Sequence, residues 1–171
     1  MHDKHLIVLD IQEYYTNNKL SVVSSQKLID SVNYIISKTI SNNVTYIKSV
    51  HKLLNLSLSY PFIYVTYDSS AMRLDNRLNL VNNHILTKEK TNTFSVEELN
   101  NFLEQKNVNE IIIIGLLAEQ CVYKSLIAGR KLGYNMYVVP EAIIGKSEKS
   151  KEKVIKKLTK KGIKIININT I

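Results

Sequence analysis

Short apolar runs alternate along the chain with longer stretches of helical period. The runs typical of buried strands are residues 6–9, 62–65, 111–114, 137–139 and 163–168. Residues 111–114 are four isoleucines bounded by charge and glycine, as in a central strand of a parallel sheet. Strands that alternate with helices pair in parallel and need helices on both faces of the sheet. The pattern therefore predicts an α/β fold with a parallel sheet between helical layers.

Apolar positions recur at helical spacing between the first two of these runs. Residues 25–39 carry four apolar side chains on one face of a helix, namely Leu28, Val32, Ile35 and Ile36. A second apolar stretch, residues 44–58, follows the break at Asn42 and Asn43. We therefore expect one or two helices over this part of the chain.

Capping signals indicate two further helices. Ser95 and Glu98 have the spacing of a capping box and predict a short helix after them. Residues 121–132 have apolar positions at helical spacing, and Gly133 follows as a C-terminal signal. This second helix is expected to open at its cysteine.

Length and cysteine content narrow the class of protein. The chain has 171 residues and no linker rich in Pro, Gly or Ser, which predicts a single domain over residues 1–171. One cysteine excludes an internal disulfide and a zinc site built from several cysteines. The first apolar run is too short for a signal peptide or a membrane span. We expect a soluble, cytoplasmic protein with no membrane partner.

The positive charge is concentrated near the C-terminus. The chain has 23 Lys plus Arg against 15 Asp plus Glu, a formal net charge of +8. Nine lysines lie in residues 146–164, around the apolar positions Val154, Ile155 and Leu158 of an amphipathic helix. A nucleic-acid surface would add aromatic residues or arginines to the lysines, and this segment has neither. A solvated helix face is therefore favoured over nucleic-acid binding.

The cysteine follows a buried strand and a glycine turn. Cys121 comes six residues after Gly115, at the start of a predicted helix. Helix N-termini present free N–H groups and a partial positive charge, so a thiol there loses its proton more easily. Position alone equally allows a buried cysteine that serves as a small apolar side chain.

Three chemically suitable residues follow predicted strands. Asp10 ends the first strand, Lys88 follows the short apolar segment Ile85-Leu86, and Cys121 follows the isoleucine run. In open parallel sheets, functional groups collect beyond the carboxyl ends of strands. An acid, a cation and a thiol there could activate a nucleophile. Singly, each residue could instead be a helix cap, a surface lysine or a core cysteine.

The order of these motifs resembles the isochorismatase-like cysteine hydrolase superfamily, which includes nicotinamidases and amidases of carbamoyl and ureido compounds. The resemblance covers roughly residues 6–144. It rests on Leu6-Ile-Val-Leu-Asp10-Ile-Gln12, on Lys88 with Phe94 six positions later, on Gly115-Leu-Leu-Ala-Glu-Gln-Cys121-Val122 and on Gly133-Tyr-Asn-Met-Tyr-Val-Val139.

The resemblance implies a three-layer α/β/α fold with a mostly parallel six-stranded sheet and an Asp-Lys-Cys triad of Asp10, Lys88 and Cys121. It also implies a cis peptide before Leu117, and an oxyanion hole made by the backbone N–H groups of Leu117 and Cys121. We expect Gln12, Tyr14, Tyr15, Phe94 and Leu116 to line the pocket.

Several positions depart from the family pattern. Glu13, Glu119 and Glu141 replace residues that are common in relatives, and Lys90 is a rival for the triad lysine, although the spacing to Phe94 favours Lys88. Nicotinamidases carry a histidine-containing metal site near the strand after Pro61, but Val65-Thr-Tyr-Asp68-Ser-Ser has no histidine pair and His84 is isolated. We therefore expect no metal and no other cofactor.

Retention of the cysteine decides the expected reaction. Relatives that hydrolyse the vinyl ether of isochorismate commonly lack this thiol, whereas amide and ureide hydrolases use it to form a thioester. We therefore expect a cysteine-dependent hydrolase of a small amide or carbamoyl compound, acting as a homo-oligomer, with Cys121 alkylated rapidly even below neutral pH. The alternatives are a catalytically silent relative that binds a ligand or partner and, less favoured, a basic nucleic-acid-binding protein.

Overall fold

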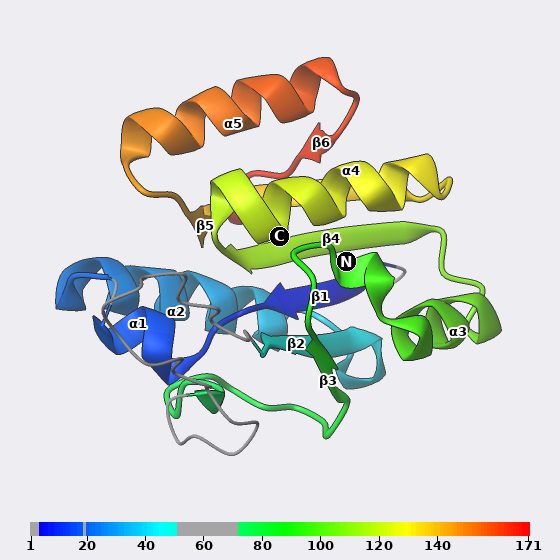
Figure 1. Cartoon of the computed structure of the whole chain (residues 1–171), viewed down its shortest axis with the longest axis horizontal. Helices are drawn as coiled ribbons and strands as arrows, with labels where there is room; N and C mark the ends of the chain where they lie inside the picture. Colours follow the sequence, from blue (N-terminus) through cyan, green and yellow to red (C-terminus); the bar gives the residue numbers. More distant parts are fainter. Residues whose placement is uncertain (1–3, 19, 51–71) are drawn as a thin grey trace, which may run out of the picture.

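A parallel sheet forms the centre of the fold. The computed structural model describes residues 4–18, 20–50 and 72–171 (Figure 1). Within these residues the sheet has six strands in the order β3-β2-β1-β4-β5-β6, all neighbours parallel. The strands are β1 (His5–Leu9), β2 (Val44–Ser49), β3 (Ile85–Lys88), β4 (Glu110–Leu116), β5 (Asn135–Ile144) and β6 (Lys164–Ile165). The parallel six-stranded α/β fold expected from the sequence is confirmed.

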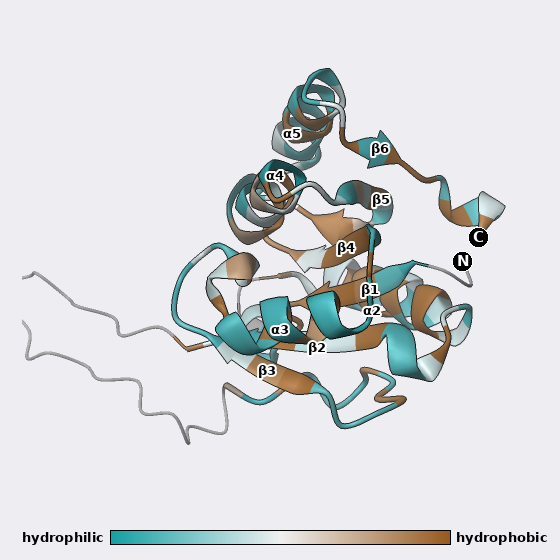
Figure 2. Cartoon of the chain, turned by 90° about the vertical axis from the view of Figure 1, so that its right-hand side faces the viewer, coloured by the Kyte–Doolittle hydropathy of each residue, from teal (hydrophilic) through white to brown (hydrophobic). Residues whose placement is uncertain are grey.

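Helices cover both faces of this sheet. They are α1 (Glu13–Asn18), α2 (Val22–Ser37), α3 (Glu97–Gln105), α4 (Tyr123–Lys131) and α5 (Glu148–Lys160). Short 3-10 turns cover Ser41–Asn43, Thr93–Ser95 and Ile168–Thr170, and a π turn covers Ala118–Val122. Figures 1 and 2 show α4 and α5 together on one side of the sheet and α2 on the other.

The alternation of side chains along the strands explains the two layers. Ile7 and Leu9 of β1 face a core made with α3, α4 and α5, while Leu6 and Val8 face a core made with α2. Successive strand residues point to opposite faces, so a central strand buried on both sides is apolar throughout. Brown colouring along β4 and teal colouring on the outer sides of α3 and α5 in Figure 2 show the same division.

One glycine permits the close approach of β1 and β4. Gly115 has a φ of +118°, and a Cβ built on it would lie 2.0 Å from the carbonyl oxygen of Leu9. Glycine is the residue that adopts positive φ without a steric cost, and it has no side chain to collide with the neighbouring strand. The site described below lies directly beyond this contact.

The prediction of a helix over residues 44–58 is wrong for the first part of this range. Val44–Ser49 is the strand β2, which pairs with β1 on one side and β3 on the other. Its residues are almost all buried, so the polar-apolar alternation that marks a half-exposed strand is missing. β-branched and aromatic residues at Val44, Thr45 and Tyr46 were the remaining strand signal. The strand expected at residues 62–65 lies outside the described residues.

Two helix starts also differ from expectation. Helix α3 begins after Val96 without a side-chain cap, and the Ser95 hydroxyl donates to the carbonyl of Asn92 instead of forming a capping box. Cys121 does not open an α-helix, because it lies in the π turn that precedes α4. The lysine-rich helix is confirmed as α5, with Val154 and Leu158 buried. Among the described helices, none is long and apolar enough to cross a membrane.

A pair of histidines at the amino end of the sheet should make stability depend on pH. His5 Nε2 and His84 Nδ1 each lie 2.8 Å from the hydroxyl of Thr45, and both rings pack on Phe102. Burial, with His84 and Lys106 adding to it, lowers the pKa of His5 to about 4; burial also lowers the pKa of His84, against the pull of Glu98.

Because the folded pKa values lie below the unfolded value of about 6.5, this stability is present above pH ~6.5 and is lost as pH falls towards 4. We expect the fold to lose about 3 kcal/mol over this window from His5. Urea denaturation at a series of pH values measures the loss, and His5→Gln, which keeps a polar partner for Thr45, should flatten the curve. Equal slopes for the two proteins would contradict the prediction.

Candidate active site

The site lies where the chain reverses its direction of progress across the sheet. From β1 the chain moves to β2 and β3 on one side, and β4 then pairs with β1 on the other side. The carboxyl ends of two such strands open a crevice that is the usual ligand site of open α/β sheets. Asp10 follows β1 there with a φ of 59°, and its N–H donates to the carbonyl of Ile47 at 2.8 Å. From this position the Asp10 carboxylate contacts residues at the carboxyl ends of β2 and β3.

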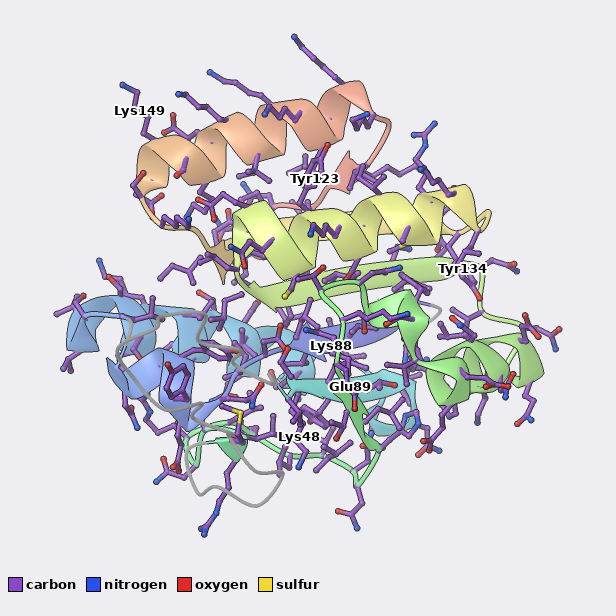
Figure 3. The ribbon with its side chains drawn as sticks, in the orientation of Figure 1. Lys48, Lys88, Glu89, Tyr123, Tyr134 and Lys149 are labelled. Atoms are coloured by element: carbon purple, nitrogen blue, oxygen red, sulfur yellow. The ribbon has the colours of Figure 1, made fainter. Side chains whose placement is uncertain are left out.

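Lys88 is a fully buried lysine at the end of β3. Its Nζ lies 2.9 Å from Asp10 Oδ2 and 3.4 Å from Cys121 Sγ, and its exposed fraction is 1%. Figure 3 shows Lys88 in the middle of the molecule, close to the ribbons of β1 and β2. Lys90 is exposed, so the structure brings Lys88 rather than Lys90 to the other two residues.

Ser49 joins the acid and the lysine, although no pattern in the sequence indicated it as a site residue. Its hydroxyl donates to Asp10 Oδ1 at 2.6 Å and accepts a hydrogen bond from Lys88 Nζ. The amide of Gln12 holds the main chain of Ser49 at two points: Nε2 donates to the carbonyl at 3.1 Å and Oε1 accepts from the N–H at 2.7 Å. Gln12, proposed as a pocket residue, is therefore a buried support for the carboxyl end of β2.

The thiol of Cys121 faces this polar cluster from the π turn Ala118–Val122. Burial, followed by the negative charge of Asp10, raises the pKa of the Cys121 thiol to about 11, against the lowering effect of Lys88. The expectation of a thiol that loses its proton easily is therefore wrong for the free protein. The lowering effect of the Lys88 ammonium is outweighed by desolvation and by the carboxylate.

A cavity of about 320 Å³ opens onto Cys121 and Asp10. Its other lining residues are Tyr15, Leu20, Leu116, Leu117, Gln120, Gly145 and Lys146. The peptide bond between Leu116 and Leu117 is cis, which confirms the cis bond implied by the resemblance. The two residues proposed for the oxyanion hole, Leu117 and Cys121, thus lie at the wall of one cavity.

The remaining predicted pocket residues divide into two groups. Tyr15 and Leu116 line the cavity, whereas Tyr14 packs edge-on against Tyr15 at a ring distance of 5.3 Å. Phe94 does not line it, because its side chain is buried between α3 and α4 and stacks on Tyr134. Phe94 therefore anchors the segment after Lys88 from the core side. Leu20, Gln120 and Lys146 are lining residues that the sequence did not indicate.

The described residues do not form a metal site. Across residues 4–18, 20–50 and 72–171, no three His, Cys, Asp or Glu side chains are grouped so that they could hold a metal ion. His84 precedes β3, at the opposite end of that strand from Lys88, and its ring is used by Thr45 and Phe102. Residues 65–70, where relatives carry the histidines of a metal site and this sequence has none, lie outside the described residues.

Comparison with known structures shows the same fold in hydrolases. The pyrazinamidase of Pyrococcus horikoshii in complex with zinc is 21% identical and has a TM-score of 0.78, with 96% of this chain and 99% of that chain covered. An isochorismatase family protein from Desulfovibrio vulgaris is 15% identical, with a TM-score of 0.82 and coverages of 98% and 95%. The N-carbamoylsarcosine amidase of Thermoplasma acidophilum is 15% identical, with a TM-score of 0.80 and coverages of 99% and 98%.

At these identities the structural likeness establishes the fold, and the sequence establishes the family. None of the curated proteins searched matches the chain. The family model of the isochorismatase domain matches residues 4–170, nearly the whole chain. The chain therefore belongs to the isochorismatase-domain family of hydrolases.

Proposed function

We propose that the protein hydrolyses the C–N bond of a small amide or carbamoyl compound through a thioester on Cys121. The observation that carries the proposal is the buried contact set of Lys88, whose Nζ lies 2.9 Å from Asp10 Oδ2 and 3.4 Å from Cys121 Sγ. A base, a cation and a nucleophile at this spacing are the parts that covalent acyl transfer needs. The cavity beside them gives a small substrate access.

In the first half of the reaction, Cys121 attacks the carbonyl carbon. The carboxylate of Asp10 takes the thiol proton as the S–C bond forms, and the carbonyl π electrons move to the oxygen. The backbone N–H groups of Leu117 and Cys121 are the proposed donors to this oxyanion. Asp10 then gives its proton to the nitrogen, the C–N bond breaks, and ammonia or an amine leaves the thioester.

In the second half, water replaces the amine. Asp10 takes a proton from the water while the water oxygen attacks the thioester carbon. The C–S bond breaks, the sulfur takes the proton back from Asp10, and a carboxylic or carbamic acid leaves. Amide and water are thus converted to acid and amine, and every proton passes through Asp10.

A thiol that is protonated in the free protein suits this sequence. With Asp10 ionised and paired to Lys88, negative charge near the sulfur keeps the proton on Cys121. Once Asp10 has taken that proton, the ammonium of Lys88 is left beside the sulfur and can stabilise its negative charge. Ser49, which contacts both side chains, holds the carboxylate and the ammonium in register during these transfers.

Replacing the buried lysine tests the proposal. Lys88→Met should lower amide turnover at least about 100-fold. The negative charge that forms on the Cys121 sulfur would then have no ammonium beside it in a buried site. A panel of small amides and carbamoyl compounds is screened by ammonia release, and intact-mass spectrometry detects the acyl-enzyme. Lys90→Met, which removes an exposed charge two residues away, is the matched control and should remain active.

Two results would contradict the proposal. One is unchanged turnover in Lys88→Met or in Cys121→Ala. The other is hydrolysis by the native protein in which isotopically labelled water enters the acid but no acyl group ever appears on Cys121, even when the reaction is quenched within one turnover.

A further inference from the structure

The lining of the cavity beside Cys121 includes one lysine, Lys146, that forms no ion pair with any acidic side chain among the described residues. We propose that Lys146 selects substrates that carry a carboxylate in addition to the amide or carbamoyl group; this inference rests on the function proposed above. Lys146 lines the cavity, and its side chain is exposed.

The main chain fixes the position of Lys146. The pairing of β4 with β5 shifts register between Ile113 and Gly115, so that Ile144 pairs with Leu116 at the edge of the cavity. The next two residues, Gly145 and Lys146, therefore lie against the cavity as well. A carboxylate oxygen of Glu119, in the π turn that carries Cys121, accepts the Lys146 N–H at 2.9 Å.

The charges around the cavity leave the Lys146 ammonium available. The charges of Asp10 and Lys88 offset each other, and the Cys121 thiol is neutral near neutral pH because its pKa is raised to about 11. Glu119 holds the main-chain N–H of Lys146, and Glu148 forms its ion pair with Lys151 at 2.9 Å. Within the described part of the chain, the Lys146 ammonium makes no ion pair.

The lining and the volume of the cavity limit the kind of ligand that it can hold. Leu20, Leu116 and Leu117 supply apolar residues to the lining that also contains Cys121 and Lys146. The volume of about 320 Å³ is at the low end of the range of about 300–1,000 Å³ that ligand pockets span. A short molecule with a carboxamide or carbamoyl group at one end and a carboxylate at the other matches this arrangement of thiol, apolar wall and cation.

Two alkylating reagents that differ in charge test the inference without knowledge of the natural substrate. Iodoacetamide is neutral and iodoacetate carries the carboxylate, and both transfer the same methylene carbon to the Cys121 sulfur with loss of iodide. Both rate constants are measured by intact-mass spectrometry at about pH 8, where lysine side chains are charged. Lys146→Met should lower the ratio of iodoacetate to iodoacetamide rates about threefold to tenfold, the effect of removing one unit charge a few ångströms away.

Lys149→Met is the matched control. Lys149 is an exposed lysine on the outer side of α5, and its side chain points away from the sheet in Figure 3. Its replacement removes the same charge from the chain and should leave the ratio unchanged. An equal fall in both variants would show a general charge effect and overturn a role for Lys146, as would an unchanged ratio in Lys146→Met.

A binding measurement separates this inference from the proposed reaction. Calorimetry with Cys121→Ala compares succinamate, which has one carboxylate and one carboxamide, with neutral succinamide. Preferential binding of succinamate that is lost in Lys146→Met and kept in Lys149→Met supports the inference even if no amide is hydrolysed. Equal binding of both compounds overturns the inference, while hydrolysis of neutral amides by the native protein would leave the proposed reaction standing.

Discussion

Asp10→Asn is expected to lower amide turnover by about 10³-fold and, at the same time, to shift alkylation of Cys121 to lower pH. Turnover falls because the amide side chain cannot take the thiol proton, and loss of a positioned base typically costs 10²–10⁴-fold. The pH at which Cys121 is alkylated falls, because the Asp10 carboxylate is one of the causes that raise the pKa of the thiol to about 11. In the native protein the alkylation rate should keep rising with pH towards that value.

The lysine variant gives the opposite shift and serves as the internal control. Lys88 lowers the pKa of Cys121, so Lys88→Met should move alkylation to higher pH. Breaking the buried pair of Asp10 and Lys88 costs about 3–5 kcal/mol, so thermal melts define a temperature at which each variant is folded. Iodoacetamide labelling against pH is then measured at that temperature. Shifts of both variants in one direction would contradict the charge assignment.

Gly115→Ala is expected to destabilise the fold by about 4 kcal/mol or more, among the largest effects of a single methyl group. The added Cβ would lie 2.0 Å from the Leu9 carbonyl oxygen, in the centre of the sheet where neither strand can move away freely. Urea denaturation measures the loss of free energy of unfolding. A displaced β1 would also carry Asp10 away from Lys88, so residual folded protein should be inactive.

A second glycine separates the destabilising effect of the steric clash from that of the positive φ. Gly133 also has a positive φ, +97°, but a Cβ built there would meet nothing within 4 Å among the described residues. Gly133→Ala should therefore cost only the left-handed penalty of about 1–2 kcal/mol. Equal losses of stability for the two variants would show that strain, and not contact with Leu9, makes glycine necessary at Gly115.

The fold could be predicted largely from apolar runs, and the exceptions have a common cause. The isoleucines of β4 are buried on both faces and bounded by charge and glycine, so the strand signal was clear. Strand β2 is equally buried, but its neighbouring residues continue the apolar pattern, and a short apolar run without alternation fits a helix as well as a strand. The π turn at Ala118–Val122 has no sequence signature that distinguishes it from the start of an α-helix.

The site could be predicted only where a residue type suggested chemistry. Asp10, Lys88 and Cys121 could be identified as candidates because each follows an apolar run, and the structure places them within contact of one another. Ser49 could not be found, because it ends β2, whose apolar pattern favours a helix, and because serine is common in loops. Lys146 is one of nine lysines in residues 146–164, and only the folded arrangement of β5 and the residues after it shows that it lines the cavity.

The buried thiol also makes the protein a reporter of its own folding. In the unfolded chain Cys121 loses burial and the nearby carboxylate together, so its pKa returns to about 8.5 and its sulfur becomes fully accessible. Near neutral pH an alkylating reagent therefore reacts far faster with an unfolded molecule than with a folded one, so the increase of the labelling rate above that of the folded protein, for example in urea, measures the equilibrium population of the unfolded form. The one cysteine of this sequence thus provides a site-specific analogue of hydrogen exchange, with no engineered label.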